Sequence, residues 1–489
     1  MPEAAAATEE LKRLAAQVML ERGLQPEFPA RAQQEAASVN RAVLEQGAGV
    51  RDLTGLPWSS IDNDDSRDLD QVEAMQERPD GSTQMLVAIA DVDSTCKLGC
   101  AMDGHARANT TSVYTVARIF PMLPEALSTR FTSLLPDETR MAIVFEFTVT
   151  AEGSITDPAV YRAMVRNQAK LAYREVAAWL DGEAPAPAAL ARVTGLEAQL
   201  RRQDQAASLL RQRRLVHGAL DFDTLQDRPV FDDGLLVDLR PDPRNRAQKL
   251  IEDLMIAANG VSARFLEQRR MPALRRVLAV PRRWDRIVAL ARELGETLPD
   301  RPDAAALAAF LARRRSADPA RFADLSLSVI KLLGSGEYAM EMPGQEADGH
   351  FGLAVRDYTH STAPNRRFPD LITQRLIKAA LDGRPSPYGM ADLQLLATHC
   401  TEQEDAATKV ERQVRKSAAA LLLGPRIGEE FSAIVTGASD KGTWVRIAAP
   451  VAEGRLVRGF QGADVGDHLR VRLVHTDVAR GHIDFARAG

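Results

Sequence analysis

Apolar residues near the N-terminus repeat at helical spacing. The run over residues 8–22 places Leu11 and Val18 on one face, and a second helix-like run covers residues 30–47. Two short helices this close together are typical of a helix-turn-helix module. We therefore expect residues 1–48 to form a small N-terminal helical module, with a helical packing arm that has no role in nucleic-acid binding as the alternative.

Strand-like and helix-like runs alternate over residues 49–425. Residues 84–92 (QMLVAIADV) and 141–149 (MAIVFEFTV) are apolar stretches of strand length, whereas residues 252–268 and 369–381 have helical periodicity. This alternation predicts one large α+β domain. The Ala- and Pro-rich sequence DGEAPAPAALARV inside it predicts a surface loop between helices.

Five short strand-like runs separated by Gly and Asp turns fill residues 426–489 and predict an OB-type β-barrel. Lys and Arg outnumber Asp and Glu from Lys409 to the end of the chain, although the whole chain is acidic. Single-strand binders combine such basic side chains with aromatic rings that stack on bases. The candidates for RNA contacts in the barrel are Trp444, Arg446, Arg458, Phe460, Arg470 and Arg472. For each of them alone, ordinary packing is the alternative.

The composition limits the classes of partner. The 489 residues include 62 Lys and Arg and 67 Asp and Glu, a net charge of −5, which argues against adhesion to nucleic acid through bulk positive charge. A channel lined by a minority of the arginines remains compatible with this sum. No apolar run of about eighteen residues occurs and the first residues are acidic, so we expect a cytoplasmic monomer that does not contact membranes.

The three cysteines, Cys96, Cys100 and Cys400, are too few for a disulfide framework. Cys96 and Cys100 also lack the second pair of ligands that a zinc site needs. We expect all three to be free thiols.

The strongest chemical signal is the segment SSIDNDDSRDLDQVE, residues 59–73. It contains five closely spaced aspartates, which are Asp62, Asp64, Asp65, Asp68 and Asp70. Crowded carboxylates repel one another unless a cation neutralises them, and a set of hard oxygen ligands suits Mg²⁺, with Mn²⁺ as an alternative. If the segment is extended, Asp68 and Asp70 face the same way and Asp62 reaches back from the preceding loop. Because Mg²⁺ leaves positions for substrate phosphate, the cluster predicts a phosphodiester-hydrolysing site.

Two other readings of this segment need no catalysis. The first is a solvated acidic turn. The second is a calcium-binding loop of the EF-hand type in a structural protein, with Asp62 at its first position and Glu73 at its twelfth. The second reading fails at the sixth position, where Arg67 stands in place of the required glycine, and the flanking sequences do not read as two helices.

Longer blocks then resemble a known family. The acidic segment is followed by LVAIADVDS, by YTVARIFPMLPEALSTRFTSLLPDETRMAIVFEF, by GALDFD, by LIEDLMIAANGVSARFL, by GHFGLAVRDYTHSTAPNRRFPDLITQRLI and by ATKVERQVRK. Together they resemble the RNase II (RNB) family of exoribonucleases from about residue 50 to the C-terminus. The resemblance implies an RNB-type catalytic domain that hydrolyses single-stranded RNA processively from 3′ to 5′. It also implies that the products are nucleoside 5′-monophosphates and a short residual oligonucleotide.

The resemblance assigns Asp62, Asp68 and Asp70 to three of the four metal-site acids of the family, with Asp68 and Asp70 also catalytic. The fourth acid is replaced by Gln71. An amide oxygen can ligate a cation but has no charge, so we expect weaker metal binding or fewer ions, unless Asp64 or Asp65 compensates. A catalytically weakened or inactive RNA-binding adaptor is therefore the alternative function, although the other family blocks favour activity.

The resemblance also implies roles for residues outside the acidic segment. Arg366 matches the catalytic arginine, whose planar guanidinium can hold two oxygens of the scissile phosphate; a salt bridge to Asp370 is the alternative. Tyr114 and Phe222 match aromatic residues that stack on RNA bases. The remaining assignments are supporting ones: Arg367 lies beside Arg366, Glu411 is expected to orient Arg366, and His350 and His360 have positioning roles at most.

Overall fold

The computed structural model describes residues 2–44, 49–78, 82–223, 226–232, 235–278, 280–281, 283–345, 349–439 and 442–488. Its centre is a mixed six-stranded sheet. The strands run in the order β1 (Val50–Asp52), β8 (Ile155–Ala172), β2 (Trp58–Asp62), β3 (Gln71–Glu77), β4 (Thr83–Ala90) and β7 (Thr139–Val149). The two apolar runs predicted as strands are β4 and β7, which pair antiparallel and are almost fully buried.

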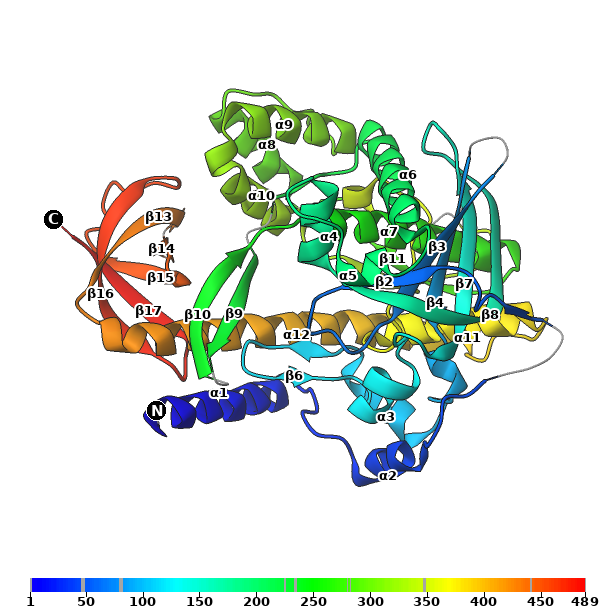
Figure 1. Cartoon of the computed structure of the whole chain (residues 1–489). Coiled ribbons are helices and arrows are strands. Elements are labelled where there is room, and N and C mark those ends of the chain that lie inside the picture. The colour runs from blue at the N-terminus through cyan, green and yellow to red at the C-terminus, as the bar shows by residue number, and fades with distance from the viewer. Residues whose placement is uncertain are drawn as a thin grey trace.

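Helices cover this sheet and extend it into a large α+β body (Figure 1). Helix α7 (Arg246–Gln268) begins at a capping box formed by Asn245 and Gln248, and it packs between the sheet and α11 (Phe368–Leu381). The other helices of the body are α3 (Ala101–Asn109), α4 (Tyr173–Leu180), α5 (Ala188–Ala191), α6 (Leu196–Val216), α8 (Trp284–Glu293), α9 (Ala304–Ala317) and α10 (Pro319–Leu333). The predicted loop around residue 187 contains α5, whose Leu190 is fully buried.

Helix α12 (Met390–Leu423) connects the sheet region to the barrel along the length of the molecule (Figure 1). The barrel is closed in the order β13 (Glu430–Ser439), β14 (Gly442–Ala448), β15 (Val451–Arg458), β17 (His482–Arg487) and β16 (His468–Asp477), which confirms the predicted five-stranded fold. The three small two-stranded sheets are β5 (Val113–Tyr114) with β6 (Ile119–Phe120), β9 (Gln226–Asp232) with β10 (Leu235–Asp242), and β11 (Ala273–Val277) with β12 (Glu337–Glu341).

The two N-terminal helices pack against different partners. Helix α1 (Pro2–Glu21) lies along α12, whereas α2 (Ala30–Ser38) packs on α3 and joins the core of the sheet. The expected second helix over residues 30–47 is too long, because the chain is already extended at Val39; residues 45–48 lie outside the described part. Both helices thus pack on the body, and whether the N-terminal segment contacts nucleic acid stays a prediction.

The three cysteines are free, as predicted. No helix in the described ranges is long and apolar enough to cross a membrane.

The contact between α1 and α12 yields a stability prediction. Leu11 is 1% exposed and shares a core with Val410 and Val414 of α12, whereas Leu20 on the same helix is 63% exposed. We expect Leu11→Ala to lower the free energy of unfolding by about 2–5 kcal/mol, because it leaves a cavity in that core. Leu20→Ala serves as the control, with a change of at most about 0.5 kcal/mol in urea unfolding. Equal effects of the two variants would show that α1 does not dock as described.

Candidate active site

The acidic segment connects β2 to β3 and is anchored by its backbone. Lys170 Nζ on β8 donates hydrogen bonds to the carbonyl oxygens of Asp64 and Ser66, at 3.1 and 2.5 Å. The hydroxyl of Ser133 accepts from the Leu69 N–H at 2.9 Å and donates to the Arg67 carbonyl at 2.8 Å. The loop that presents the acids is therefore held from two other elements.

Asp70 is the most deeply buried of the predicted metal ligands, at 2% exposure. Its Oδ1 accepts a hydrogen bond from the Asn365 backbone N–H at 2.9 Å. Its Oδ2 is buried without a hydrogen-bond partner and lies 3.8 Å from Nε of Arg366. Burial raises the pKa of Asp70 to about 8, and the charge of Arg366 opposes that rise.

The charge of Arg366 acts on all three predicted acids, of which Asp70 forms an ion pair with it. Burial raises the pKa of Asp62 and of Asp68, and the negative charge of Asp62 adds to the rise at Asp68. The positive charge of the Arg366 guanidinium opposes this rise at all three carboxyls, Asp70 included. Asp62 Oδ1 also accepts hydrogen bonds from the Asn63 N–H and the Ser66 hydroxyl. Asp70 is buried and Asp62 and Asp68 are half-buried, so the solvated-turn reading does not describe these three acids.

The structure gives no support for compensation of Gln71 by Asp64 or Asp65. Both aspartates lie in the exposed turn of the segment, outside the buried cluster. Gln71 is the first residue of β3 and pairs with Ile89 of β4. Among the described residues, no hydrogen bond joins its amide to the three clustered acids. The charge missing at position 71 is therefore not supplied from the turn.

The loop carrying Arg366 is fixed independently of the acids. The Arg366 carbonyl accepts from the Ser112 N–H at 2.9 Å, and the Phe368 N–H donates to the Thr110 carbonyl at 2.8 Å. Asp370, fully buried at the start of α11, pairs with Arg367 at 2.7 Å and accepts from the Ala363 N–H at 2.8 Å. Asp370 therefore pairs with Arg367, whereas Arg366 forms a long ion pair of 3.8 Å with Asp70 and its side chain remains 44% exposed.

Tyr114 is 41% exposed and close enough to this cluster for the charges of Arg366, Asp68 and Asp70 to act on its hydroxyl. Burial of its hydroxyl raises its pKa, with Arg366 opposing and Asp68 and Asp70 adding to the shift. Glu411 of α12 does not orient Arg366 as expected; its Oε1 accepts the backbone N–H of Tyr114 at 2.9 Å. Glu411 therefore positions the aromatic residue instead of the arginine, because β5 lies between α12 and the loop.

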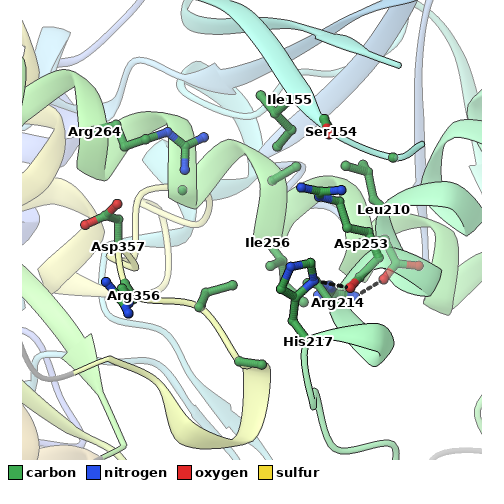
Figure 2. A pocket seen from close by; sticks show the side chains of 16 residues that line it. Ser154, Ile155, Leu210, Arg214, His217, Asp253, Ile256, Arg264, Arg356 and Asp357 are labelled. Atoms are coloured by element: carbon green, nitrogen blue, oxygen red, sulfur yellow. Dashed lines mark hydrogen bonds and ion pairs between the residues drawn. The ribbon is translucent and has the colours of Figure 1, made fainter. Parts of the chain in front are cut away.

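Phe222 lies in a cavity of the body whose lining does not include the predicted metal ligands. It is half-buried and lines a cavity of about 630 Å³ together with Arg211, Lys249 and His350, and its stacking role stays a prediction. A neighbouring cavity of about 530 Å³ is lined by four arginines, which are Arg213, Arg214, Arg264 and Arg356 (Figure 2). The two cavities share Asp253, which forms an ion pair with Arg214.

His350 is half-buried, His360 is buried, and both are hydrogen-bonded within the protein. Burial lowers the pKa of His350 to about 4, and that of His360 falls well below its ordinary value for the same reason. His350 Nδ1 accepts the Leu353 N–H, and His360 Nδ1 shares a 2.8 Å hydrogen bond with the Tyr338 hydroxyl. These neutral, internally bonded rings fit the positioning roles expected of them.

The barrel candidates divide into three groups. Arg446 forms a 2.7 Å ion pair with Asp324 of α10, so it joins the barrel to the body and is not free for RNA. Arg470 and Arg472 both pair with Glu430 and remain more than half exposed. Trp444 is partly buried against Gly437, whereas Arg458 and Phe460 are exposed. The exposed members are the ones that remain candidates for RNA contacts.

Two residues of the site were missed by the sequence reasoning. Glu73 on β3 is buried, and both of its carboxylate oxygens lack a hydrogen-bond partner. Tyr173 at the start of α4 has its pKa raised by burial and by the charges of Asp62 and Glu73. The available signal was an acid placed between the apolar residues Val72 and Ala74.

The residues of the cluster fit a hard divalent cation. All of their donors are oxygens, and the buried Oδ2 of Asp70 lacks a partner that an ion would provide. Within the described ranges, no three acids, histidines or cysteines converge closely enough to hold an ion by themselves. Mg²⁺ needs only one or two carboxylates and takes its other ligands from water and phosphate.

Comparison with known proteins agrees with this fold. The RNB domain family matches residues 50–383, and the RNase II-type exonuclease C-terminal S1 domain matches residues 429–488. The chain therefore belongs to the RNB domain family and has an RNase II-type S1 domain at its C-terminal end.

Among individual relatives, ribonuclease R of Vibrio parahaemolyticus is 30% identical over 86% of this chain, and the chain spans 51% of that protein's length. The structure of Mycoplasma genitalium RNase R in complex with ribose-methylated single-stranded RNA has the same fold, with a TM-score of 0.87 and 23% identity over 97% of this chain and 77% of that one. Yeast Ssd1, a pseudonuclease, also shares it, with a TM-score of 0.72 and 16% identity over 94% of this chain and 58% of that one. The fold alone therefore does not establish catalysis.

The raised pKa of Asp70 makes the stability of the metal-free protein depend on pH. Its folded pKa of about 8 lies above the unfolded value of about 3.9. The folded state thus binds more protons between these values, and stability falls as the pH rises from about 4 to about 8. In urea unfolding with a chelator present, we expect Asp70→Asn to lose less stability than the wild type over this range. Parallel pH profiles would contradict the burial of an ionisable Asp70.

Proposed function

We propose that the protein is a divalent-metal-dependent exoribonuclease that degrades single-stranded RNA from its 3′ end and releases nucleoside 5′-monophosphates. The observation that carries the proposal is the buried Asp70, bonded to Asn365 and facing Arg366 through its orphaned oxygen. Acids for a cation and an arginine for a phosphate are thus assembled in one place. The relatives named as ribonuclease R support the reaction class and the 3′ to 5′ direction.

The roles of the chain's own residues follow from the geometry. Asp62, Asp68 and Asp70 would hold Mg²⁺ or Mn²⁺, which supplies Lewis-acid polarisation of the phosphate and activation of the attacking water. Arg366, exposed above Asp70, is placed to hold the phosphate oxygens and offset the charge that develops on them. Because hydrogen bonds to the backbone hold both the loop with the acids and the loop with Arg366, the acids and Arg366 need little rearrangement when RNA binds.

Base-indifferent binding follows from Tyr114. Its ring is exposed beside the acids, and every base presents a flat face on which an aromatic ring can stack. Stacking of this kind requires an unpaired strand. The exposed arginines of the barrel and those lining the two cavities suit a polyanion.

Asp70→Asn tests catalysis directly, because it preserves the shape of the side chain and removes the charge. With a 5′-labelled RNA oligomer and Mg²⁺, we expect nucleotide release to fall by at least about 100-fold while RNA affinity, measured by fluorescence anisotropy, persists. Asp64→Asn, an exposed acid of the same segment, is the matched control and should retain turnover. A wild type that binds RNA without releasing nucleotides would instead identify the RNA-binding adaptor that Gln71 raises as the alternative.

Tyr114→Ala tests the stacking role. Loss of one aromatic platform should weaken binding of single-stranded RNA by about 5- to 150-fold, which corresponds to about 1–3 kcal/mol. Tyr114→Phe keeps the ring and should bind RNA as the wild type does. If the alanine variant also binds normally in anisotropy titrations, the ring does not stack on RNA.

A further inference from the structure

Glu73 is a buried acid without a visible partner. It lies in the middle of β3, is 1% exposed, and neither carboxylate oxygen accepts a hydrogen bond. Placing an isolated carboxylate in such surroundings is costly unless a charge or hydrogen bonds compensate. Other buried or half-buried glutamates of the body are compensated: Glu341 pairs with Arg275, and Glu146 on β7 accepts from Tyr161 and Gln84.

The position of Glu73 relates it to the acidic cluster. Strands β2 and β3 pair through Ser59 and Glu73, and Asp62 ends the same strand on which Ser59 lies. The Ser59 hydroxyl is likewise buried without a partner. After burial, the negative charge of Asp62 is the largest influence that raises the pKa of Glu73, and Tyr173 lies close to both acids. Buried polar atoms without hydrogen-bond partners therefore occur both in the acidic cluster, at Asp70, and in the adjoining strands, at Ser59 and Glu73.

Glu73 also relates to the residue that departs from the family pattern. Gln71 stands where the resemblance requires an aspartate, and Glu73 is two residues further along the same strand. Residues two apart on a strand point to the same face of the sheet. Glu73 therefore places a carboxylate on the same face of the sheet as Gln71, on a side chain that is one methylene longer than that of aspartate.

We propose that Glu73 supplies the fourth negative charge of the metal site in place of the carboxylate missing at Gln71. This inference rests on the proposed metal-dependent function. The charge of a bound divalent ion would offset the mutual repulsion of Asp62 and Glu73 and explain why two orphaned oxygens persist in the core. Exposed Asp64 and Asp65 cannot serve in this way, because solvent screens their charges.

The test is the affinity for Mn²⁺ without RNA, measured by electron paramagnetic resonance of the free ion and by calorimetry. We expect Glu73→Gln to weaken Mn²⁺ binding by about 10- to 100-fold, as expected for removal of a carboxylate that supports a metal site. The double variant Glu73→Gln with Gln71→Asp should restore the affinity to within about threefold of the wild type. Glu146→Gln, which removes a glutamate from the same sheet, is the control and should bind Mn²⁺ normally.

The outcomes separate this inference from the proposed function. If the wild type binds Mn²⁺ and Glu73→Gln binds it equally well, the inference fails and the metal-dependent function stands. A loss that Gln71→Asp does not restore also overturns it, because the two positions would then not be equivalent. If the wild type binds no Mn²⁺ at all, both fail. Should Glu73→Gln fold poorly, Glu73→Met, which keeps the length of the side chain, provides the same comparison.

Discussion

The hydrogen bond from the Asn365 backbone to Asp70 is the contact on which the site depends. It joins two segments 295 residues apart in the chain, the acidic loop after β2 and the arginine loop before α11. Each loop is anchored separately, the first by Lys170 and Ser133 and the second by the β5 region. Because both anchors belong to the packed body, the acid and Arg366 meet in a geometry that the fold determines.

The same contact explains the electrostatics of the site. Burying Asp70 beside other acids raises its pKa, and the charge of Arg366 opposes the rise at all three acids, with Lys170 adding to it at Asp62. Such an arrangement favours neutral carboxyls in the absence of a cation and charged carboxyls when one is bound. The burial of Asp70 therefore has two consequences. It lowers the stability of the metal-free protein at neutral pH, and it favours binding of a divalent ion.

Much of this architecture could be predicted from the sequence. The apolar runs of β4 and β7, the five barrel strands and the grouping of Asp62, Asp68 and Asp70 all follow from local patterns. What local patterns could not supply is the tertiary partner of a side chain. Glu411 binds the Tyr114 backbone instead of an arginine, and Arg446 of the barrel pairs with Asp324 of the body. In both cases several partners of the same chemistry are possible, and the partner that is bound is the one that folding brings next to the side chain. Glu73, an acid between Val72 and Ala74, gave a local signal of burial, but one sequence does not show that both faces of its strand are covered.

The most direct measurement is the anomalous scattering of Mn²⁺ in crystals of the wild-type protein. The account predicts a peak beside the Oδ2 atom of Asp70, between the acidic loop and Arg366. Peaks found only at the exposed turn around Asp64, with the buried acids unliganded at saturating Mn²⁺, would contradict it.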